Sequence, residues 1–160
     1  MSKPNDPIRD HLARLLEWEE AHVGFDQAVA GVPAHARGEC PRGFEHSPWQ
    51  LLEHLRIAQD DLLDFCLNAK YEHNRAWPDD YWPKEKAPED DAAWSFSIAE
   101  CTRSRRQLQQ LTREVDDLTA KVPTGNPNQT YLRAILIAAD HVAYHLGQLV
   151  AVRRALGVWS

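Results

Sequence analysis

The sequence predicts an all-α protein in the form of a four-helix bundle. Apolar residues recur every three or four positions over long segments, which is the period of a helix. No segment shows the alternating Val, Ile and Thr pattern with hairpin turns that is typical of strands. The helical segments number four and are separated by stretches rich in proline and glycine. With 160 residues, we expect one domain spanning residues 1–160.

The first predicted helix begins at Asp6-Pro7. Aspartate is a favoured N-cap, and proline suits the first helical position. Apolar residues follow at helical spacing: Ile8, Leu12, Leu15, Leu16, Val23 and Ala30. The Gly31-Val32-Pro33 stretch should end this helix, and a loop is expected over residues 33–46.

The second predicted helix has the clearest start in the chain, "HSPWQLLEHL". Ser47 is a suitable cap, Pro48 takes the first position, and Gln50 stands at the spacing of a capping box. The helix is expected to continue to about Ala69 with an apolar stripe of Leu51, Leu55, Ala58, Leu62 and Phe65.

Residues 71–90 interrupt the helical pattern with three prolines, two of them in Trp-Pro pairs. A residue that precedes proline is biased away from the helical conformation. Long loops in compact domains are often lids or binding loops. We therefore expect a long Trp- and Pro-rich loop between the second and third helices. We also expect this loop to help shape the entrance to a site.

The third predicted helix covers about Asp90 to Leu118, and the last covers about Thr130 to Leu156. Between Arg133 and Arg153 the last helix has one formally charged residue, Asp140. Its apolar residues span about half of the helical circumference. Such a helix should be covered on more than one side and lie centrally in the bundle.

Two histidines in the last helix, His141 and His145, are the first candidates for chemistry. Residues four apart project from one face of a helix, one turn apart, and this spacing can hold a transition metal. A hydrogen-bonded pair in the core is the alternative. A catalytic zinc-type site has three protein ligands and a water molecule, so a third ligand is needed. His54, which flanks the apolar stripe of the second helix, is the best candidate.

Several polar residues stand near these histidines in the pattern. Gln148 shares their helix face, so it could contact a metal-bound water or form a hydrogen bond across the bundle. His46 and His73 are expected at the surface rather than as a fourth ligand. Asp61 and Asp140 are expected to be solvated or in interhelical ion pairs, rather than to orient an imidazole.

Other residues suggest packing or no special site. Gly147 is unfavourable inside a helix, which suggests close approach of a neighbouring helix. Cys66 and Cys101 fit the apolar stripes as inert core residues. Glu19 and His22 form an E-x-x-H pair, as in di-iron bundles. A di-iron site needs a second such pair, which the last helix lacks.

The composition excludes several classes of protein. A net charge of -6 argues against a nucleic-acid partner, because phosphate binding requires a basic surface. Three cysteines without a CxxC motif argue against a disulfide framework. No apolar run approaches about 18 residues, so no membrane span is expected. The start of the chain lacks the apolar core of a signal peptide, so a cytoplasmic location is expected.

The segments "SPWQLLEHLRIAQ" and "AADHVAYHLGQL" resemble the DinB/YfiT-like superfamily. The resemblance implies an up-down-down-up bundle that forms homodimers. It also implies a divalent metal, nickel or zinc, bound by His54, His141 and His145. The family's H-x-x-x-H-x-G-Q-L pattern is matched by His141, His145, Gly147, Gln148 and Leu149.

The resemblance leaves the reaction open. Some members of the superfamily are S-transferases that use bacillithiol or a related low-molecular-weight thiol. One related branch is a mycothiol-dependent maleylpyruvate isomerase, and many members have no known activity. We therefore expect a metal-dependent thiol S-transferase or hydrolase acting on a small molecule. The alternative is a non-catalytic, stress-associated metal-binding bundle that acts as an interaction protein.

Overall fold

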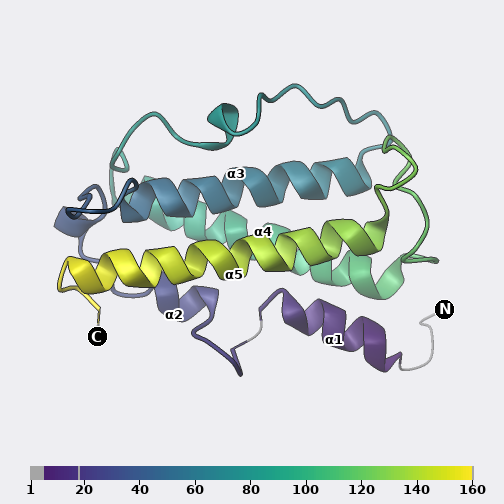
Figure 1. Ribbon diagram of the computed structural model, residues 1–160, viewed down its shortest axis with the longest axis horizontal. Helices are drawn as coiled ribbons and strands as arrows, with labels where there is room; N and C mark the ends of the chain where they lie inside the picture. Colours follow the sequence, from purple (N-terminus) through teal and green to yellow (C-terminus); the bar gives the residue numbers. More distant parts are fainter. Residues whose placement is uncertain (1–5, 18, 160) are drawn as a thin grey trace.

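The computed structural model describes residues 6–17 and 19–159 (Figure 1). Within these residues it is all-helical, so the predicted all-α class is confirmed. The α-helices are α1 (Pro7–Leu15), α2 (Phe25–Val29), α3 (Pro48–Leu67), α4 (Asp91–Glu114) and α5 (Tyr131–Ala155). Two short 3-10 helices, η1 (Ala34–Ala36) and η2 (Asp79–Tyr81), lie in the connecting loops.

The prediction of one continuous first helix is wrong. The segment is divided into α1 and α2 by residues 16–24. In this connection, residue 17 and residues 19–22 are exposed. A helix there would gain little packing energy to offset the conformational entropy lost when the backbone is ordered. Gly24 caps α2, and its backbone lies against Glu19 so closely that an added Cβ would be 2.5 Å from the Glu19 Cγ atom.

The second predicted helix is present as α3, and its start agrees with the capping box. The Ser47 hydroxyl oxygen accepts a hydrogen bond from the Gln50 backbone N–H (3.2 Å), and Gln50 Oε1 accepts one from the Ser47 N–H (3.1 Å). The helix ends at Leu67, two residues before the predicted end.

The third predicted helix, α4, is shorter than expected. Asp90 caps its start by accepting a hydrogen bond from the Ala93 N–H (2.7 Å). The backbone leaves the helix at Val115, where ψ is 137°. Asp117 then forms a local turn by accepting a hydrogen bond from the Thr119 N–H (2.8 Å). Aspartate competes with a helix through such local bonds, which explains why α4 does not reach Leu118.

The three long helices lie side by side, with α3 packed against both α4 and α5 (Figure 1). Helices α3 and α4 point in the same direction, because residues 68–90 return along the length of α3 before α4 begins. Helix α5 points in the opposite direction. Helix α1 packs mainly against α4, and α2 packs against α5. The antiparallel pairing of α3 with α5 places residues from distant parts of the sequence on facing helix surfaces.

Helix α5 is less fully covered than its sequence predicted. Ile135, Leu149 and Val152 are buried. Leu136, however, is 44% exposed, and Ile137 is 39% exposed. Helix α5 is also long and apolar enough to span a membrane, by length and composition alone, which the sequence pattern had not indicated. In its most apolar 18-residue segment, 44% of the residues are buried inside the protein. The core helix of a soluble protein can be equally long and apolar.

Candidate metal centre

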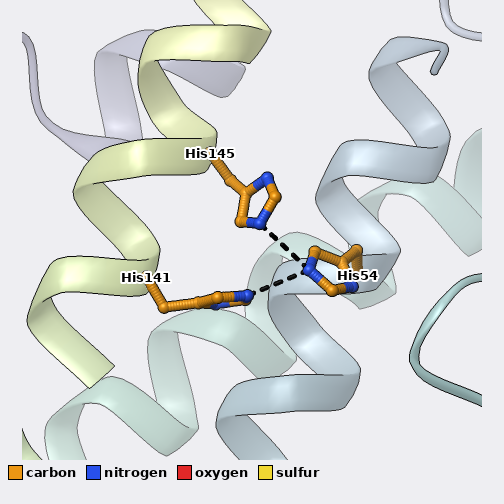
Figure 2. A group of neighbouring side chains, drawn as sticks. All are labelled: His54, His141 and His145. Carbon is orange, nitrogen blue, oxygen red and sulfur yellow. Dashed lines mark hydrogen bonds between the residues drawn. The ribbon is translucent and has the colours of Figure 1, made fainter. Parts of the chain in front are cut away.

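Three histidine side chains converge between α3 and α5 (Figure 2). His54 lies in the second turn of α3, and His141 and His145 lie on adjacent turns of α5. His54 Nε2 is 2.9 Å from His141 Nε2 and 3.0 Å from His145 Nε2. The structure therefore brings together the three residues that the helical spacing predicted.

The remaining ring nitrogens fix the tautomers of two of these imidazoles. His54 Nδ1 lies 2.8 Å from the backbone carbonyl oxygen of Tyr81. His145 Nδ1 lies 2.6 Å from Gln148 Oε1. A carbonyl oxygen can only accept, so each Nδ1 carries the hydrogen. The Nε2 atoms of His54 and His145 are therefore unprotonated in the neutral rings, and each presents a lone pair.

The chemistry of this donor set fits a metal ion. Two lone pairs that face each other across 3.0 Å repel unless a cation lies between them. Two nitrogens that bind one zinc ion at about 2.0–2.1 Å are themselves about 2.9–3.4 Å apart, depending on the angle at the metal. The separations of 2.9 and 3.0 Å between His54 and its two partners lie within that range.

Burial keeps the three rings neutral. His54 is 1% exposed and His145 is 7% exposed. Burial is the main cause that lowers the pKa of His54 to about 4 and that of His141 to about 3, and the charge of neighbouring imidazoles contributes in the same direction. Burial also lowers the pKa of His145. A neutral imidazole is the form that binds a metal, so the site is ready to bind at neutral pH without releasing protons.

A comparison with protein families identifies the family of the chain. A family model described as the DinB superfamily matches residues 17–149, a stretch that contains all three histidines. The chain belongs to the DinB superfamily. Neither the comparison with curated proteins nor the comparison with solved structures gave a match.

The Trp-Pro loop of this DinB chain lies directly on the candidate metal centre. The Trp82 ring stacks on the His54 ring with centroids 3.8 Å apart and parallel planes. It also stacks on His46, at 3.7 Å. Tyr81 contributes the carbonyl oxygen that accepts from His54. The sequence located the loop near a site but did not indicate any of these three contacts.

The other two histidines considered as a fourth ligand lie outside the group. His46 contacts the Trp82 ring, and burial lowers its pKa. His73 Nδ1 is 3.0 Å from the Tyr71 hydroxyl. Within residues 6–17 and 19–159, the group whose ligand atoms lie within 4.8 Å of one another consists of His54, His141 and His145.

The acids near the site in sequence have different surroundings. Asp140 is exposed, in agreement with a solvated role. Asp61 accepts hydrogen bonds from the hydroxyl groups of Tyr81 (2.5 Å) and Tyr71 (3.1 Å). It therefore reaches His54 indirectly, through Tyr81. The spacing of seven residues from His54, two turns along one face of α3, was the available signal for this link.

Gly147 does not have the role that its position suggested. A Cβ atom added there would meet nothing within 4 Å among the described residues, so the expected close approach of a neighbouring helix is wrong. Gln148 forms its hydrogen bond within α5, to His145, and not across the bundle. Its predicted contact with a metal-bound water remains a prediction.

Proposed function

We propose that this DinB-superfamily protein is a metal-dependent enzyme, of the thiol S-transferase or hydrolase type, acting on a small molecule. His54, His141 and His145 would hold a divalent ion, nickel or zinc. The observation that carries the proposal is the pair of unprotonated Nε2 atoms of His54 and His145, 3.0 Å apart in a buried position.

The donor set favours a catalytic ion over a purely structural one. Structural zinc sites are closed by four protein ligands, whereas catalytic sites have three and keep a position open. A bound divalent ion lowers the pKa of a coordinated water or thiol and so supplies a nucleophile at neutral pH. The chain holds the rings in place through the Tyr81 carbonyl and Gln148, while Trp82 excludes water from one face of His54.

A hollow further along α3 is the proposed position for the non-reacting part of the substrate or of a low-molecular-weight thiol. Its volume is about 320 Å³, and α3 and α5 both contribute to it, as they do to the histidine group. It is lined by Asp61, Leu62, Phe65, Tyr71, His73, Thr124, Gln129 and Arg133.

Gln148 is the proposed contact of a metal-bound water or thiol. Because the Oε1 atom of Gln148 accepts a hydrogen bond from His145, the amide nitrogen of Gln148 is the group that would donate to that water or thiol.

Metal content tests the first part of the proposal. Untagged protein, purified without chelator and analysed by mass spectrometry of its elements, should contain close to one equivalent of nickel or zinc. The His141→Ala variant should lose the ion, while His35→Ala, which changes an exposed histidine in η1, should retain it. Less than about a tenth of an equivalent in wild type, even after incubation with either metal, would overturn the metal site.

Activity tests the second part. The metal-loaded protein would be screened with low-molecular-weight thiols against electrophiles, and with ester and amide substrates for hydrolysis. Turnover should depend on the ion and disappear in His141→Ala. A metal-loaded protein that turns over none of these substrates would favour the alternative function.

The alternative function is a non-catalytic metal-binding bundle that acts as an interaction protein. Two exposed aromatic rings beside the histidine group favour it. Trp77 is 66% exposed with its ring centroid 6.4 Å from that of His54, and Tyr144 is 64% exposed with its ring 4.9 Å from that of His145. If these rings bind a partner protein, the Trp77→Ala variant should keep its metal and lose the partner.

We further infer that α1 and α2 together represent the first helix of an up-down-down-up four-helix bundle. We propose a cytoplasmic homodimer without a nucleic-acid or membrane partner. The net charge of -6 supports the absence of a nucleic-acid partner. The exposed Leu136 and Ile137 on α5 support a second copy as the cover of that face.

A further inference from the structure

Asp61 is a carboxylate of α3 that lies outside the group of candidate metal ligands, and its side chain has defined hydrogen-bond partners. Its side chain is 19% exposed. It accepts a hydrogen bond of 2.5 Å from the Tyr81 hydroxyl and a longer one, 3.1 Å, from the Tyr71 hydroxyl. Arg75 lies 4.0 Å away. The strongest contact of Asp61 is therefore with the loop residue that also contacts His54.

Tyr81 and Trp82 fix His54 from two sides. The Tyr81 backbone carbonyl accepts a hydrogen bond from His54 Nδ1 (2.8 Å), and the Trp82 ring covers one face of the imidazole. Because the carbonyl accepts a hydrogen bond from Nδ1, that nitrogen carries the hydrogen of the neutral ring. The lone pair of Nε2 is then available to bind a metal. The position of that carbonyl is thus a condition for the metal centre.

Apart from the stacked Trp82 ring, the loop itself provides little to hold this carbonyl in place. Tyr81 is the one buried residue between Leu67 and Asp91, and residues 72–80 are all exposed. After Tyr81, the next hydrogen bond from the loop to the body of the protein is at Lys86, whose carbonyl accepts from the Ser47 hydroxyl (2.5 Å). Besides the bond from His54 Nδ1 to its carbonyl, Tyr81 is attached to α3 by the hydrogen bond from its hydroxyl to Asp61.

We propose that Asp61 is a positioning residue of the metal centre, which acts on His54 through Tyr81. By holding the Tyr81 side chain, Asp61 keeps the Tyr81 carbonyl against His54 Nδ1 and directs His54 Nε2 toward the ion. The inference rests on the proposed function, since it concerns the same ion. Partners of metal-binding histidines outside the ligand set typically contribute about 10- to 100-fold to metal affinity.

Two substitutions test the proposal with Co²⁺ as the probe. Asp61→Ala and Tyr81→Phe should each raise the Co²⁺ dissociation constant by about 10- to 100-fold, measured by competition with a chromophoric chelator. The visible spectrum of bound Co²⁺ should also change, because the orientation of one ligand changes. Asp61→Asn, which retains an acceptor, should restore part of the affinity. Asp64→Ala, one turn further along α3 and exposed, is the matched control and should behave as wild type.

The double variant Asp61→Ala/Tyr81→Phe separates a shared role from two independent ones. If Asp61 acts through Tyr81, the double variant should bind Co²⁺ about as weakly as Asp61→Ala alone. Losses that multiply would overturn the proposal. So would folded single variants, verified by circular dichroism, with the affinity and spectrum of wild type.

The tautomer of His54 gives a readout that does not depend on metal. In ¹⁵N-detected spectra of metal-free wild type at neutral pH, His54 should carry its hydrogen on Nδ1. In Tyr81→Phe, which removes only the hydroxyl oxygen, a mixture of tautomers is expected. An unchanged tautomer would overturn the proposal. A wild type that binds no metal but shows this tautomer shift would contradict the proposed function and leave the positioning role supported.

Discussion

Two oxygen atoms of different origin each accept a hydrogen bond from the Nδ1 atom of an imidazole, and so each leaves the Nε2 atom of that ring unprotonated. One is the backbone carbonyl of Tyr81 beside His54, and the other is the side-chain amide of Gln148 beside His145. The amide belongs to the H-x-x-x-H-x-G-Q-L pattern and was visible in the sequence. A backbone carbonyl belongs to every residue type, so no residue pattern could have identified the one beside His54.

The three cysteines should differ sharply in reactivity. Cys66 and Cys101 are buried, as their positions in the apolar stripes predicted, and Cys40 is partly exposed. Burial raises the pKa of Cys66 to about 12 and that of Cys101 further, so neither forms a thiolate at neutral pH. A thiol-specific disulfide reagent should therefore modify one thiol in the native protein and three after denaturation. Rapid modification of all three in the native protein would contradict the buried positions.

At the scale of the elements, the capping signals at helix starts were accurate, whereas a division within a helix and the contacts of the long loop were missed. The start of α3 was predicted because Ser47, Pro48 and Gln50 act on their own neighbours. The division of the first helix was not predicted, because it depends on the exposure of residue 17 and residues 19–22 in the folded protein. The contact of Trp82 with His54 also depends on how the loop returns over α3, which no local pattern encodes.

The cap of α3 should contribute measurably to stability. Ser47 is fully buried, and its hydroxyl both accepts from the Gln50 N–H and donates to the Lys86 carbonyl. Ser47→Ala should lower the free energy of unfolding by about 1–2 kcal/mol, the range for loss of an N-cap, as measured by urea denaturation. Ser95→Ala, on an exposed position within α4, is the control and should change stability by less than about 0.5 kcal/mol.

Gly147 offers a substitution of the opposite sign. A glycine inside a helix costs about 1 kcal/mol relative to alanine, and an added Cβ would meet nothing within 4 Å among the described residues. Gly147→Ala should therefore raise the free energy of unfolding by about 1 kcal/mol. A decrease that grows with protein concentration would instead indicate that a second copy packs against this position.

At the scale of the whole molecule, the buried histidines make the metal-free protein sensitive to acid. An unfolded histidine has a pKa of about 6.5, whereas burial lowers the pKa of His54 to about 4 and that of His141 to about 3. Between these values the unfolded chain binds more protons than the folded one. The free energy of unfolding should therefore fall as the pH falls from about 6.5 toward 4.

Chelator-treated protein gives the measurement for this acid sensitivity. Urea denaturation at several pH values should show the decline in wild type and a weaker one in His141→Gln, which removes one of the titrating groups. Equal slopes in the two proteins would show that His141 does not contribute.

The proposed homodimer makes a separate prediction for the exposed face of α5. Leu136 and Ile137 are large apolar residues on that face, and a second copy would remove them from water. The Leu136→Lys/Ile137→Lys variant should therefore be a monomer by light scattering after gel filtration, while wild type is a dimer. Arg133→Lys, which preserves the charge of an exposed residue on the same helix, should remain a dimer.

The histidine group also has a consequence for the connectivity of the chain. His54 is separated from His141 by 87 residues and from His145 by 91, and the cysteines form no disulfide. An ion held by these side chains would close a loop that contains more than half of the protein. Closing so long a loop restricts the unfolded chain far more than it restricts the native one. In that respect the ion would act as a reversible cross-link between α3 and α5. Because it would bind the native protein and not the unfolded chain, its binding would stabilise the native state.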